Sequence, residues 1–374
     1  MIQINDNKDC CGCSACVQKC PKKCIAFTED VEGFLYPQID ISKCIECGLC
    51  EKVCPVINQS QECIPIDVYA AMNPNIEIRL ESSSGGVFTQ IAEHIIDLGG
   101  VVFGVKWNHQ FLAVHDYTDT KDGLKAFRGS KYVQSQVGET FIQAEKYLKK
   151  GRYVLFSGTS CQISALKLYL RKDYSNLVTL DLVCHGVPSP KIWREYLSSL
   201  QLNDIGDILH KDKITGWRGY SFSILDMYGK RIFTERASYN KYLNAFVDNL
   251  ILRPSCFDCP SKAGKSQSDI TIADFWGVEQ QVPKMDDNKG TSLICINTQK
   301  GKELINQLGI ILSKVDYNKS IQYNSCLVKS TNLPVTRRQF WENYCEYGIE
   351  ALPIKRKENI FIMLMKKIIN RIAR

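Results

Sequence analysis

Eight cysteines near the start of the chain are spaced as ligands of iron–sulfur clusters. They form two copies of the pattern C-x2-C-x2-C-x3-C-P, and the second copy starts 34 residues after the first. Thiolates at these intervals can bind three corners of one cube from a single tight loop, and the fourth cysteine of each copy binds the other copy's cube. The sequence therefore predicts two [4Fe–4S] clusters. The ligands of the first cluster are Cys10, Cys13, Cys16 and Cys54, and those of the second cluster are Cys20, Cys44, Cys47 and Cys50.

A zinc site and a disulfide framework are the alternatives for these cysteines. Zinc takes four ligands, usually from two separated C-x2-C pairs, whereas this chain has two runs of four cysteines. Disulfides belong to oxidising compartments, but the N-terminal residues lack the basic and apolar segments of a signal peptide. The sequence also has no apolar run of about 18 residues, the length that a membrane-spanning helix needs. We therefore expect a cytoplasmic protein.

Positive charge is concentrated at the C-terminal end. The 374 residues carry a net charge of +7, but residues 355–374 hold seven Lys or Arg residues against a single Glu. The remainder is nearly neutral and lacks the broad basic surface of a nucleic-acid-binding protein, so we expect no nucleic-acid partner. Residues 359–374 place apolar and basic side chains on opposite faces of a predicted helix. Such a helix could lie on an anionic membrane surface, or it could dock on the protein itself or on a partner subunit.

Strand and helix patterns alternate after a polar linker at residues 58–66. Strands are predicted at residues 68–72, 101–105, 111–115, 153–156, 177–183, 219–225, 231–235, 269–275 and 293–298. Helices are predicted at residues 87–98, 138–150 and 239–252, and also after Cys161 and after Ser189. The segments 219–225 and 231–235 are expected to form a hairpin, and 111–115 is expected to pair antiparallel with 101–105. The alternation as a whole indicates a mostly parallel sheet.

Four further cysteines could form a third site. Cys161 and Cys184 each follow a predicted buried strand, at the sheet edge where α/β proteins bind ligands. Cys256 and Cys259 form a C-x2-C pair. If the two strands are neighbours, the four thiols could bind a third [4Fe–4S] cluster; otherwise Cys161 and Cys184 are small buried apolar residues and the pair contributes to a zinc site. The remaining six cysteines lack ligand spacing and are predicted to be structural: Cys11, Cys24, Cys63, Cys295, Cys326 and Cys345.

Two Ser- and Gly-rich turns precede predicted helices, at residues 81–86 and 157–159. The free backbone N–H groups and the dipole of such a helix start can bind a phosphate. Neither turn matches a dinucleotide or P-loop motif, and Ser-rich turns are commonly simple N-caps. Residues 128–132, RGSKY, could add a cation near a phosphate or a flavin ring, or could form a solvated loop.

Seven motifs occur in an order that resembles the coenzyme F420 hydrogenase/dehydrogenase beta-subunit family. They are the cysteine repeat, SSSGGVFT at residues 82–89, RGSKYVQS at 128–135, SGTSCQ at 157–162, CHGVPSP at 184–190, the C-x2-C pair at 256–259 and DITIADFWG at 269–277. The resemblance spans about residues 1–300. The fused N-terminal ferredoxin domain, GWRGYSFS at 216–223 and DFWG at 274–277 are most similar to a branch encoded among polysaccharide-biosynthesis genes.

The resemblance implies FAD as a second kind of cofactor. The residues that it places at the flavin are Ser83, Ser84, Gly85, Gly86, Lys131, Tyr132, Thr159 and Gln162. It also implies a third [4Fe–4S] cluster, with the ligands Cys161, Cys184, Cys256 and Cys259. The family usually has proline before the first of these cysteines, where this chain has Ser160. Asp274 and Trp276 could line the flavin pocket, although Trp276 could also be a core residue.

These features together predict an α+β/α/β protein. A bacterial-type two-cluster ferredoxin domain would occupy residues 1–57. A mixed α/β flavin-binding catalytic domain would follow, with its N-terminal part at residues 66–150 and its C-terminal part, including the third cluster, at residues 151–350. A basic amphipathic helix at residues 355–374 would form the C-terminal tail.

The predicted cofactors indicate an oxidoreductase. Clusters pass single electrons, whereas a flavin can collect two and deliver them as a hydride. We expect electrons from ferredoxin or another redox donor to pass through the clusters to FAD and to reduce a small-molecule substrate. The branch resemblance implies a sugar or glycan precursor. The alternatives are a coenzyme F420-dependent enzyme that passes electrons to ferredoxin, and a subunit that relays electrons to a separate catalytic protein. His185 could serve a cluster or a substrate, or could be a structural residue at a strand end.

Overall fold

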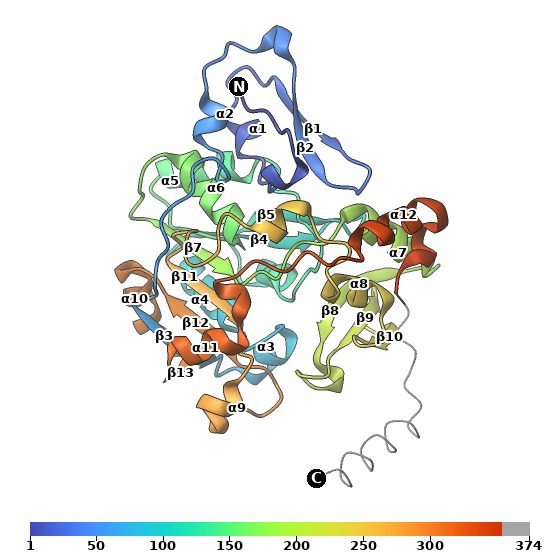
Figure 1. The fold of residues 1–374 in the computed structure, drawn as a ribbon. Coiled ribbons are helices and arrows are strands. Elements are labelled where there is room, and N and C mark those ends of the chain that lie inside the picture. The colour runs from blue at the N-terminus through green and yellow to red at the C-terminus, as the bar shows by residue number, and fades with distance from the viewer. Residues whose placement is uncertain (354–374) are drawn as a thin grey trace.

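The computed structural model describes residues 1–353. A small N-terminal domain stands above a larger α/β body in Figure 1. The predicted basic helix at residues 355–374 lies outside the described residues. No helix within residues 1–353 is long and apolar enough to cross a membrane.

The N-terminal domain consists of cysteine-bearing loops, two short helices and one hairpin. Its elements are η1 (Asn7–Asp9), α1 (Ala15–Lys19), β1 (Ile25–Glu29), β2 (Leu35–Ile39), η2 (Ile41–Lys43) and α2 (Leu49–Lys52). Strands β1 and β2 pair antiparallel. Helix α1 packs against two helices of the body, α5 (Thr140–Lys149) and α6 (Ser160–Leu170). The two domains therefore share a packed interface.

The body is built on an eight-stranded sheet in the order β13-β3-β12-β11-β7-β6-β4-β5. The strands are β3 (Asp67–Met72), β4 (Val101–Trp107), β5 (Ala113–Thr118), β6 (Val154–Thr159), β7 (Leu177–Leu182), β11 (Ile270–Asp274), β12 (Ser292–Ile296) and β13 (Ile311–Lys314). Residues on both sides of position 150 supply strands to this one sheet. The predicted antiparallel pairing next to residues 101–105 is confirmed, since β5 pairs antiparallel with β4.

The prediction of a mostly parallel sheet is correct only at the centre of the sheet. Strands β4, β6, β7 and β11 are parallel neighbours. The outer neighbours β12, β3, β13 and β5 all pair antiparallel. Strand β5 follows β4 after a short turn, and β12 follows β11 after a loop with only the short helices α9 (Val278–Gln281) and η6 (Pro283–Met285). A parallel neighbour needs a crossover, usually a full helix, so these connections produce antiparallel pairs.

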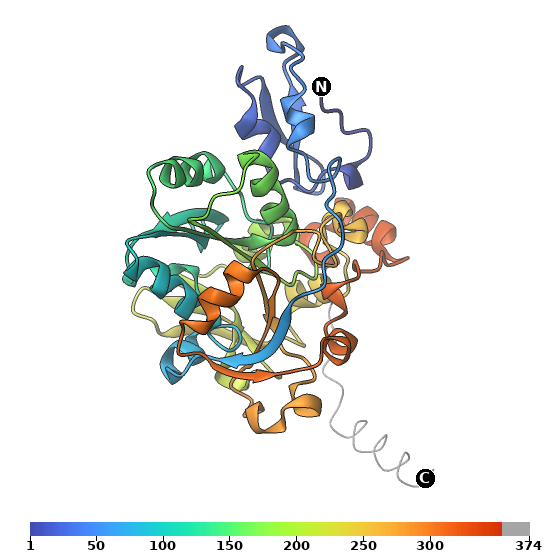
Figure 2. The same ribbon diagram turned by 90° about the vertical axis from the view of Figure 1, so that its left-hand side faces the viewer.

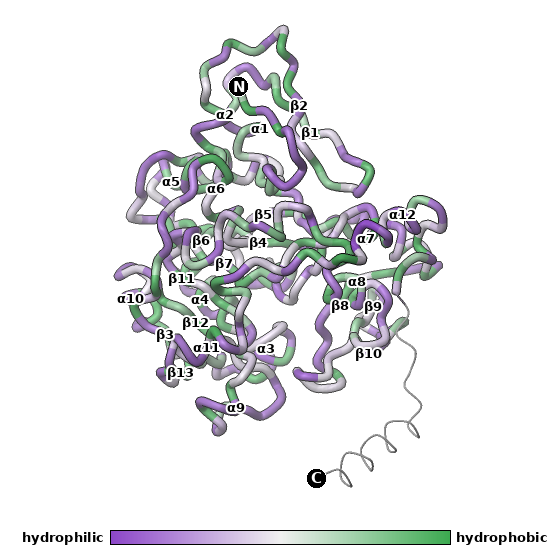
Figure 3. Tube along the Cα trace, viewed as in Figure 1, coloured by the Kyte–Doolittle hydropathy of each residue, from purple (hydrophilic) through white to green (hydrophobic). Residues whose placement is uncertain are grey.

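Helices cover both faces of the sheet. Alternate side chains of a strand point to opposite faces; accordingly Phe103 and Phe156 pack toward α5 and α6, whereas Val102 and Leu155 pack toward α4 (Val87–Asp97) and α10 (Gln299–Asn306). Figure 2 shows this layered arrangement from the side. In Figure 3 hydrophobic segments run through the interior and hydrophilic ones lie mostly at the periphery.

A second, three-stranded sheet lies beside the first. It contains β8 (Ile205–Asp212), β9 (Ser221–Asp226) and β10 (Arg231–Arg236) in antiparallel order, so the predicted hairpin at residues 219–235 is confirmed. Strand β8 was not predicted. The apolar core that packs against this second sheet includes residues of α7 (Pro190–Ser199), α8 (Lys241–Val247) and α12 (Arg337–Tyr347).

Two predicted elements have the wrong extent. The helix expected at residues 239–252 ends at Val247, because Asn249 adopts a left-handed conformation (φ 63°) that ends a helix. The turn expected at residues 157–159 is part of β6, where these residues pair with Leu180, Asp181 and Leu182 of β7. Hydrogen bonding to the neighbouring strand β7 therefore keeps residues 157–159 extended, although their Ser and Gly content favours a turn.

Candidate cluster and cofactor sites

The N-terminal domain groups its thiols around two cavities. One cavity is lined by the thiols predicted to bind the first cluster, together with Cys11 and apolar residues: Cys10, Cys13, Cys16, Cys54, Ile2, Ile4, Phe27, Pro37 and Val56. The other is lined by Cys20, Cys44, Cys47 and Cys50, together with Cys24. The fourth cysteine of each sequence copy therefore lies with the three cysteines of the other copy. The structure thus brings together the thiols of each predicted ligand set, and their binding of clusters stays a prediction.

Backbone N–H groups are directed at the ligand sulfurs. The Ile2 N–H lies 3.4 Å from Cys50 Sγ, and the Glu46 N–H lies 3.4 Å from Cys44 Sγ. Hydrogen bonds of this kind tune the reduction potential of a cluster. Among residues 1–353, no three His, Cys, Asp or Glu side chains are arranged to hold a single metal ion; in this domain the thiols instead surround cavities.

The two cavities differ in exposure. Cys47, at the second, is exposed, and the neighbouring Ile41 and Ile45 are 71% and 56% exposed. Cys13, Cys16 and Cys54, at the first, are buried. The second cluster site is thus close to the surface, whereas the first lies next to the body of the protein.

Cys161, Cys184, Cys256 and Cys259 form a third group of thiols. Cys161 follows β6 and Cys184 follows β7, which are parallel neighbours, so their carboxyl ends meet at one edge of the sheet. The Val187 N–H lies 3.4 Å from Cys256 Sγ. Burial and the charges of Cys161 and Cys259 raise the pKa of Cys184 to about 12. Burial, together with the charge of Cys161, also raises the pKa of Cys259 to about 11. The four thiols are therefore close enough to act on one another, and burial favours their protonated forms while no metal is bound.

Cys11 lies between the first and third groups, a position that sequence reasoning missed. It is buried, and its thiol is within hydrogen-bonding reach of both Cys13 and Cys161. These three residues pack into the same apolar cluster. Cys24 is similarly close to a ligand, since its Sγ lies 3.3 Å from Cys20 Sγ. Both residues were predicted to be only structural because they stand outside the repeated spacing.

The SSSGG turn at residues 82–86 is a tightly held loop before α4. Gly86 has φ 79° and caps the helix, and Gly85 donates its N–H to Ser292 Oγ at 2.9 Å. The Ser83 hydroxyl accepts the Ser130 N–H at 2.6 Å. The Ser84 hydroxyl donates to the Thr291 carbonyl at 2.8 Å. The structure therefore brings this turn together with the RGSKY segment, as the flavin prediction requires.

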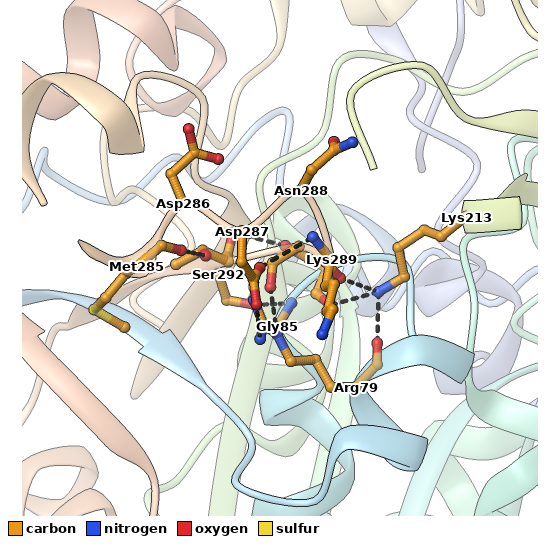
Figure 4. A network of polar contacts seen from close by, with 12 residues as sticks. Arg79, Gly85, Lys213, Met285, Asp286, Asp287, Asn288, Lys289 and Ser292 are labelled. Atoms are coloured by element: carbon orange, nitrogen blue, oxygen red, sulfur yellow. Dashed lines mark hydrogen bonds and ion pairs between the residues drawn. The ribbon is translucent and has the colours of Figure 1, made fainter. Parts of the chain in front are cut away.

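Lys213, which the sequence did not single out, joins the same turn to the loop after β11. Its Nζ donates to the carbonyl groups of Arg79 (2.5 Å), Ser84 (3.0 Å) and Lys289 (2.7 Å). Figure 4 shows this network, in which Arg79 also makes a two-pronged ion pair with Asp287. No carboxylate of the described residues forms an ion pair with Lys213. Burial, followed by the charges of Lys211 and Arg79, lowers the pKa of Lys213 to about 7.

Lys131 and Tyr132 lie beside this network. Lys131 Nζ donates only to carbonyl groups, including that of Arg128 at 2.7 Å, and burial lowers its pKa to about 8. The Tyr132 ring stacks on His210 and on Phe246, with centroids 5.7 and 5.0 Å apart. Lys131 and Lys213 are thus two partly desolvated ammonium groups that border the SSSGG turn. Carboxylate charges act on them, from Asp207 on Lys131 and from Asp274 and Asp287 on Lys213, but neither forms an ion pair with a carboxylate of the described residues. A bound phosphate or pyrophosphate would supply a direct partner, so these residues fit the phosphates of FAD.

Thr159 and Gln162 lie at the third thiol group. Thr159 caps α6, its N–H donates to Gln162 Oε1 at 2.9 Å, and its hydroxyl lies 3.3 Å from Cys161 Sγ. Gln162 also donates to Ser135 Oγ at 3.1 Å. No hydrogen bond within the described chain joins either residue to the SSSGG turn. Their side chains support the Cys161 loop, and a role at the flavin stays a prediction.

Asp274 and Trp276 belong to an aromatic wall next to Lys213. The buried Lys211 forms an ion pair with Asp274 at 2.5 Å, and its Nζ lies 5.0 Å from the Trp276 ring centroid. Trp217 stacks on Trp276, with centroids 4.8 Å apart. Trp276 is 37% exposed, so it is not a core residue. The GWRGYSFS and DFWG segments thus pack against each other, with Trp217 buried beneath the partly exposed Trp276.

His185 connects the third thiol group to Tyr132. It follows Cys184, its Nε2 lies 2.6 Å from Asn249 Oδ1, and its ring meets the Phe246 ring edge-on with centroids 5.2 Å apart. Since Phe246 stacks on Tyr132, the rings of His185, Phe246 and Tyr132 form a continuous packed path. Burial lowers the pKa of His185, which favours the neutral ring.

Replacing Gly85 with alanine is expected to destabilise the protein strongly. The new Cβ would lie 2.4 Å from the Ala71 carbonyl oxygen and 2.8 Å from the Ser292 nitrogen, both backbone atoms of paired strands. Overpacking of this kind costs about 1–3 kcal/mol or more. The midpoint of thermal unfolding measures the effect. Gly309→Ala is the matched control, because its nearest contact is a side-chain atom at 3.8 Å; equal midpoints for both variants would contradict the prediction.

Two family models match parts of the chain. Residues 9–58 match the family model of the 4Fe-4S dicluster domain, and residues 151–311 match the model of the C-terminal part of the coenzyme F420 hydrogenase/dehydrogenase beta subunit. A chain of the xenon-derivatised F420-reducing [NiFe] hydrogenase complex from Methanosarcina barkeri is similar at 16% identity and a TM-score of 0.46, over 77% of this chain and 95% of that chain. No curated protein matches the sequence.

The domain model and the grouped thiols define an iron–sulfur protein of the oxidoreductase class. The chain carries an N-terminal 4Fe-4S dicluster domain, and its residues 151–311 are similar to the C-terminal part of the coenzyme F420 hydrogenase/dehydrogenase beta subunit.

Proposed function

We propose that this protein is an iron–sulfur flavoprotein oxidoreductase. It passes electrons between a one-electron donor of the ferredoxin kind and a two-electron substrate, through three [4Fe–4S] clusters and FAD. The observation that carries the proposal is the continuous series of sites from the surface to the SSSGG turn. The second thiol group is exposed at Cys47, and the first adjoins the third through Cys11. The rings of His185, Phe246 and Tyr132 lead from the third group to the candidate flavin site.

The exposed edge of the second group supports an entry point for electrons. Ile41 and Ile45 offer an apolar surface next to Cys47, which suits brief docking of a small redox protein. When bound, FAD would supply the conversion from single electrons to an electron pair. The chain's own residues would hold it: the SSSGG turn, Lys213 and Lys131 at its phosphates, and Tyr132 beside it.

The substrate class rests on the resemblance to the polysaccharide-biosynthesis branch. We propose a sugar or glycan precursor, bound against Trp276. This residue is 37% exposed and stacks on the buried Trp217, so its indole ring offers a fixed surface that suits the apolar face of a sugar ring. Peripheral membrane contact through residues 355–374 stays a prediction.

A relay subunit is the second candidate, because the matched family model describes a beta subunit of a hydrogenase or dehydrogenase. In that case the substrate would bind to a partner protein. Reduced coenzyme F420 as the donor is the remaining alternative.

Anaerobic reduction of the bound flavin tests these proposals. Reduced ferredoxin, NADH, NADPH and reduced F420 are offered separately, and flavin absorbance is recorded. We expect bound FAD and bleaching by reduced ferredoxin, and we expect Cys47→Ser to slow that bleaching. Absence of flavin after anaerobic purification, or bleaching by NADPH that is independent of the clusters, would overturn the proposal. Rapid reoxidation by a sugar nucleotide would separate the enzyme from the relay subunit.

A further inference from the structure

Arg253 is a buried cation at the contact between the first and third thiol groups. Its side chain is fully buried. The guanidinium donates from Nε to the Cys10 carbonyl at 2.7 Å, from Nη1 to Gln134 Oε1 at 2.9 Å and from Nη2 to the Leu35 carbonyl at 2.9 Å. It also lies 4.3 Å from the Tyr36 ring centroid. The hydrogen bonds therefore fix the guanidinium in one position, against the backbone of the first cluster loop.

The backbone of Arg253 belongs to the third thiol group. Its N–H donates to the Val187 carbonyl, and its carbonyl accepts the Cys256 N–H at 2.9 Å. Val187 in turn directs its N–H at Cys256 Sγ. One residue thus has its main chain in the loop of Cys256 and its charged head on the loop of Cys10. The adjacent Gly12 leaves room for this head, since a Cβ there would lie 2.9 Å from Arg253 Nη1.

No carboxylate neutralises Arg253 in the described part of the chain. Two other arginines link the body to the N-terminal domain, and each has an acidic partner: Arg194 pairs with Glu29, and Arg337 pairs with Glu32. A buried cation without negative charge nearby is strongly disfavoured. The hydrogen-bond acceptors of the Arg253 guanidinium are neutral oxygen atoms, and its remaining contacts are with aromatic rings. The loops that Arg253 joins carry cluster thiols, Cys10 on one side and Cys256 on the other, which become negative when a cluster binds.

Arg253 reaches the third group through its own loop, since its carbonyl accepts the Cys256 N–H at 2.9 Å. Lys262 is a second cation there, donating to the carbonyl groups of Cys184 and Cys326. Unlike Arg253, it has no hydrogen bond to the N-terminal domain.

We propose that Arg253 is the shared counter-ion of the first and third clusters and fixes the route by which an electron leaves the N-terminal domain. The inference rests on the proposed function, because it requires the third cluster. In the step concerned, the first cluster gives up one electron and the third cluster accepts it; no bond is broken and no proton is required. Because net charge and hydrogen bonding set a cluster's potential, the guanidinium stabilises the reduced form of both clusters. The second cluster, with Cys47 at the surface, serves as the entry.

Redox titration followed by electron paramagnetic resonance tests Arg253 in the full chain purified without oxygen. R253M and R253Q remove the charge, and replacing a buried ion with an apolar side chain is often tolerated. We expect at least a tenfold lower ratio of reduced to oxidised cluster at a given potential for both the first and third clusters, which equals about 59 mV for a one-electron couple. R253K is expected to stay within threefold of the parent, and the second cluster is expected not to shift.

Two controls separate charge from structure. R194Q removes an arginine that bridges the same two domains but is exposed and paired, so no cluster should shift. K262Q should shift the third cluster only. Unchanged potentials in R253M, or equal shifts in R253M and R253K, would overturn the proposal. If R253M and R253Q do not fold, K262Q still tests the proposal. Equal shifts in the reduction potentials of the first and third clusters in K262Q would show that a cation without contact to the N-terminal domain affects both clusters, and would overturn the special role of Arg253. The iron content of the parent protein separates failure of the Arg253 proposal from failure of the proposed function. About eight irons per chain would mean that the third cluster is absent, and the proposed function would then fail as well.

Discussion

Protein carrying Cys256→Ser is expected to bind about eight iron atoms per chain, against about twelve in the parent, because each [4Fe–4S] cluster holds four irons and needs its thiolate ligands. Cys256 is half-buried, shares its surroundings with Cys184, Cys259 and Cys161, and receives the Val187 N–H. Iron analysis and electron paramagnetic resonance measure the loss. Reduced ferredoxin should then no longer bleach the flavin, although a small chemical reductant still should. The ferredoxin-type clusters should remain.

Cys345→Ser is the matched control for this experiment, because Cys345 is an exposed thiol outside all three groups. It should leave both iron content and flavin reduction unchanged. A parent protein with about eight irons per chain, a value that Cys256→Ser did not alter, would rule out the third cluster. That result would be compatible with an intact dicluster domain. It would favour electron transfer directly from the first cluster to the flavin.

Replacing Lys213 with methionine is expected to weaken flavin binding by roughly one to two orders of magnitude, since a hydrogen bond to a charged group contributes about 1.5–3 kcal/mol. Lys213 holds the SSSGG turn to the loop of residues 285–292 and brings an unpaired positive charge to both. Equilibrium dialysis of FAD against the flavin-free protein measures the change. Lys289→Met is the control, because Lys289 is exposed on the same loop and enters the network through backbone hydrogen bonds, by its carbonyl to Lys213 and its N–H to Asp287. Equal losses in both variants would contradict a specific role for Lys213.

The same lysine predicts how flavin binding depends on pH. Burial lowers the pKa of Lys213 to about 7 in the flavin-free protein, and a bound phosphate would raise it. The protonated form is therefore the one that binds best. Affinity should be constant below pH 7 and should fall as the pH rises above 7, by up to about tenfold per pH unit for one group. The fall should be absent in Lys213→Met; an affinity that rose with pH would contradict the assignment.

The sequence alone determined the grouping of the cluster thiols in the N-terminal domain. Ligand sets in this domain depend on loops of fixed length, so that spacing specifies which thiols can meet. The resemblance to the family implied that Ser83 and the RGSKY segment lie at one site, and the pattern of strands predicted the hairpin at residues 219–235. The hairpin is local, and the cysteine spacing is repeated along the chain.

Only the tertiary structure decided the features that depend on contacts distant in sequence. Connections without a crossover helix made β5 and β12 antiparallel to the strands before them, and pairing with β7 extended β6 through residues 157–159. Lys213, Cys11 and Arg253 carry no motif. Their importance comes from where the fold buries them: between two loops, between two thiol groups and, for Arg253, 243 residues along the chain from the Cys10 carbonyl that it binds. A cation buried away from water must find negative charge close by, and spacing along one chain does not reveal which groups will provide it.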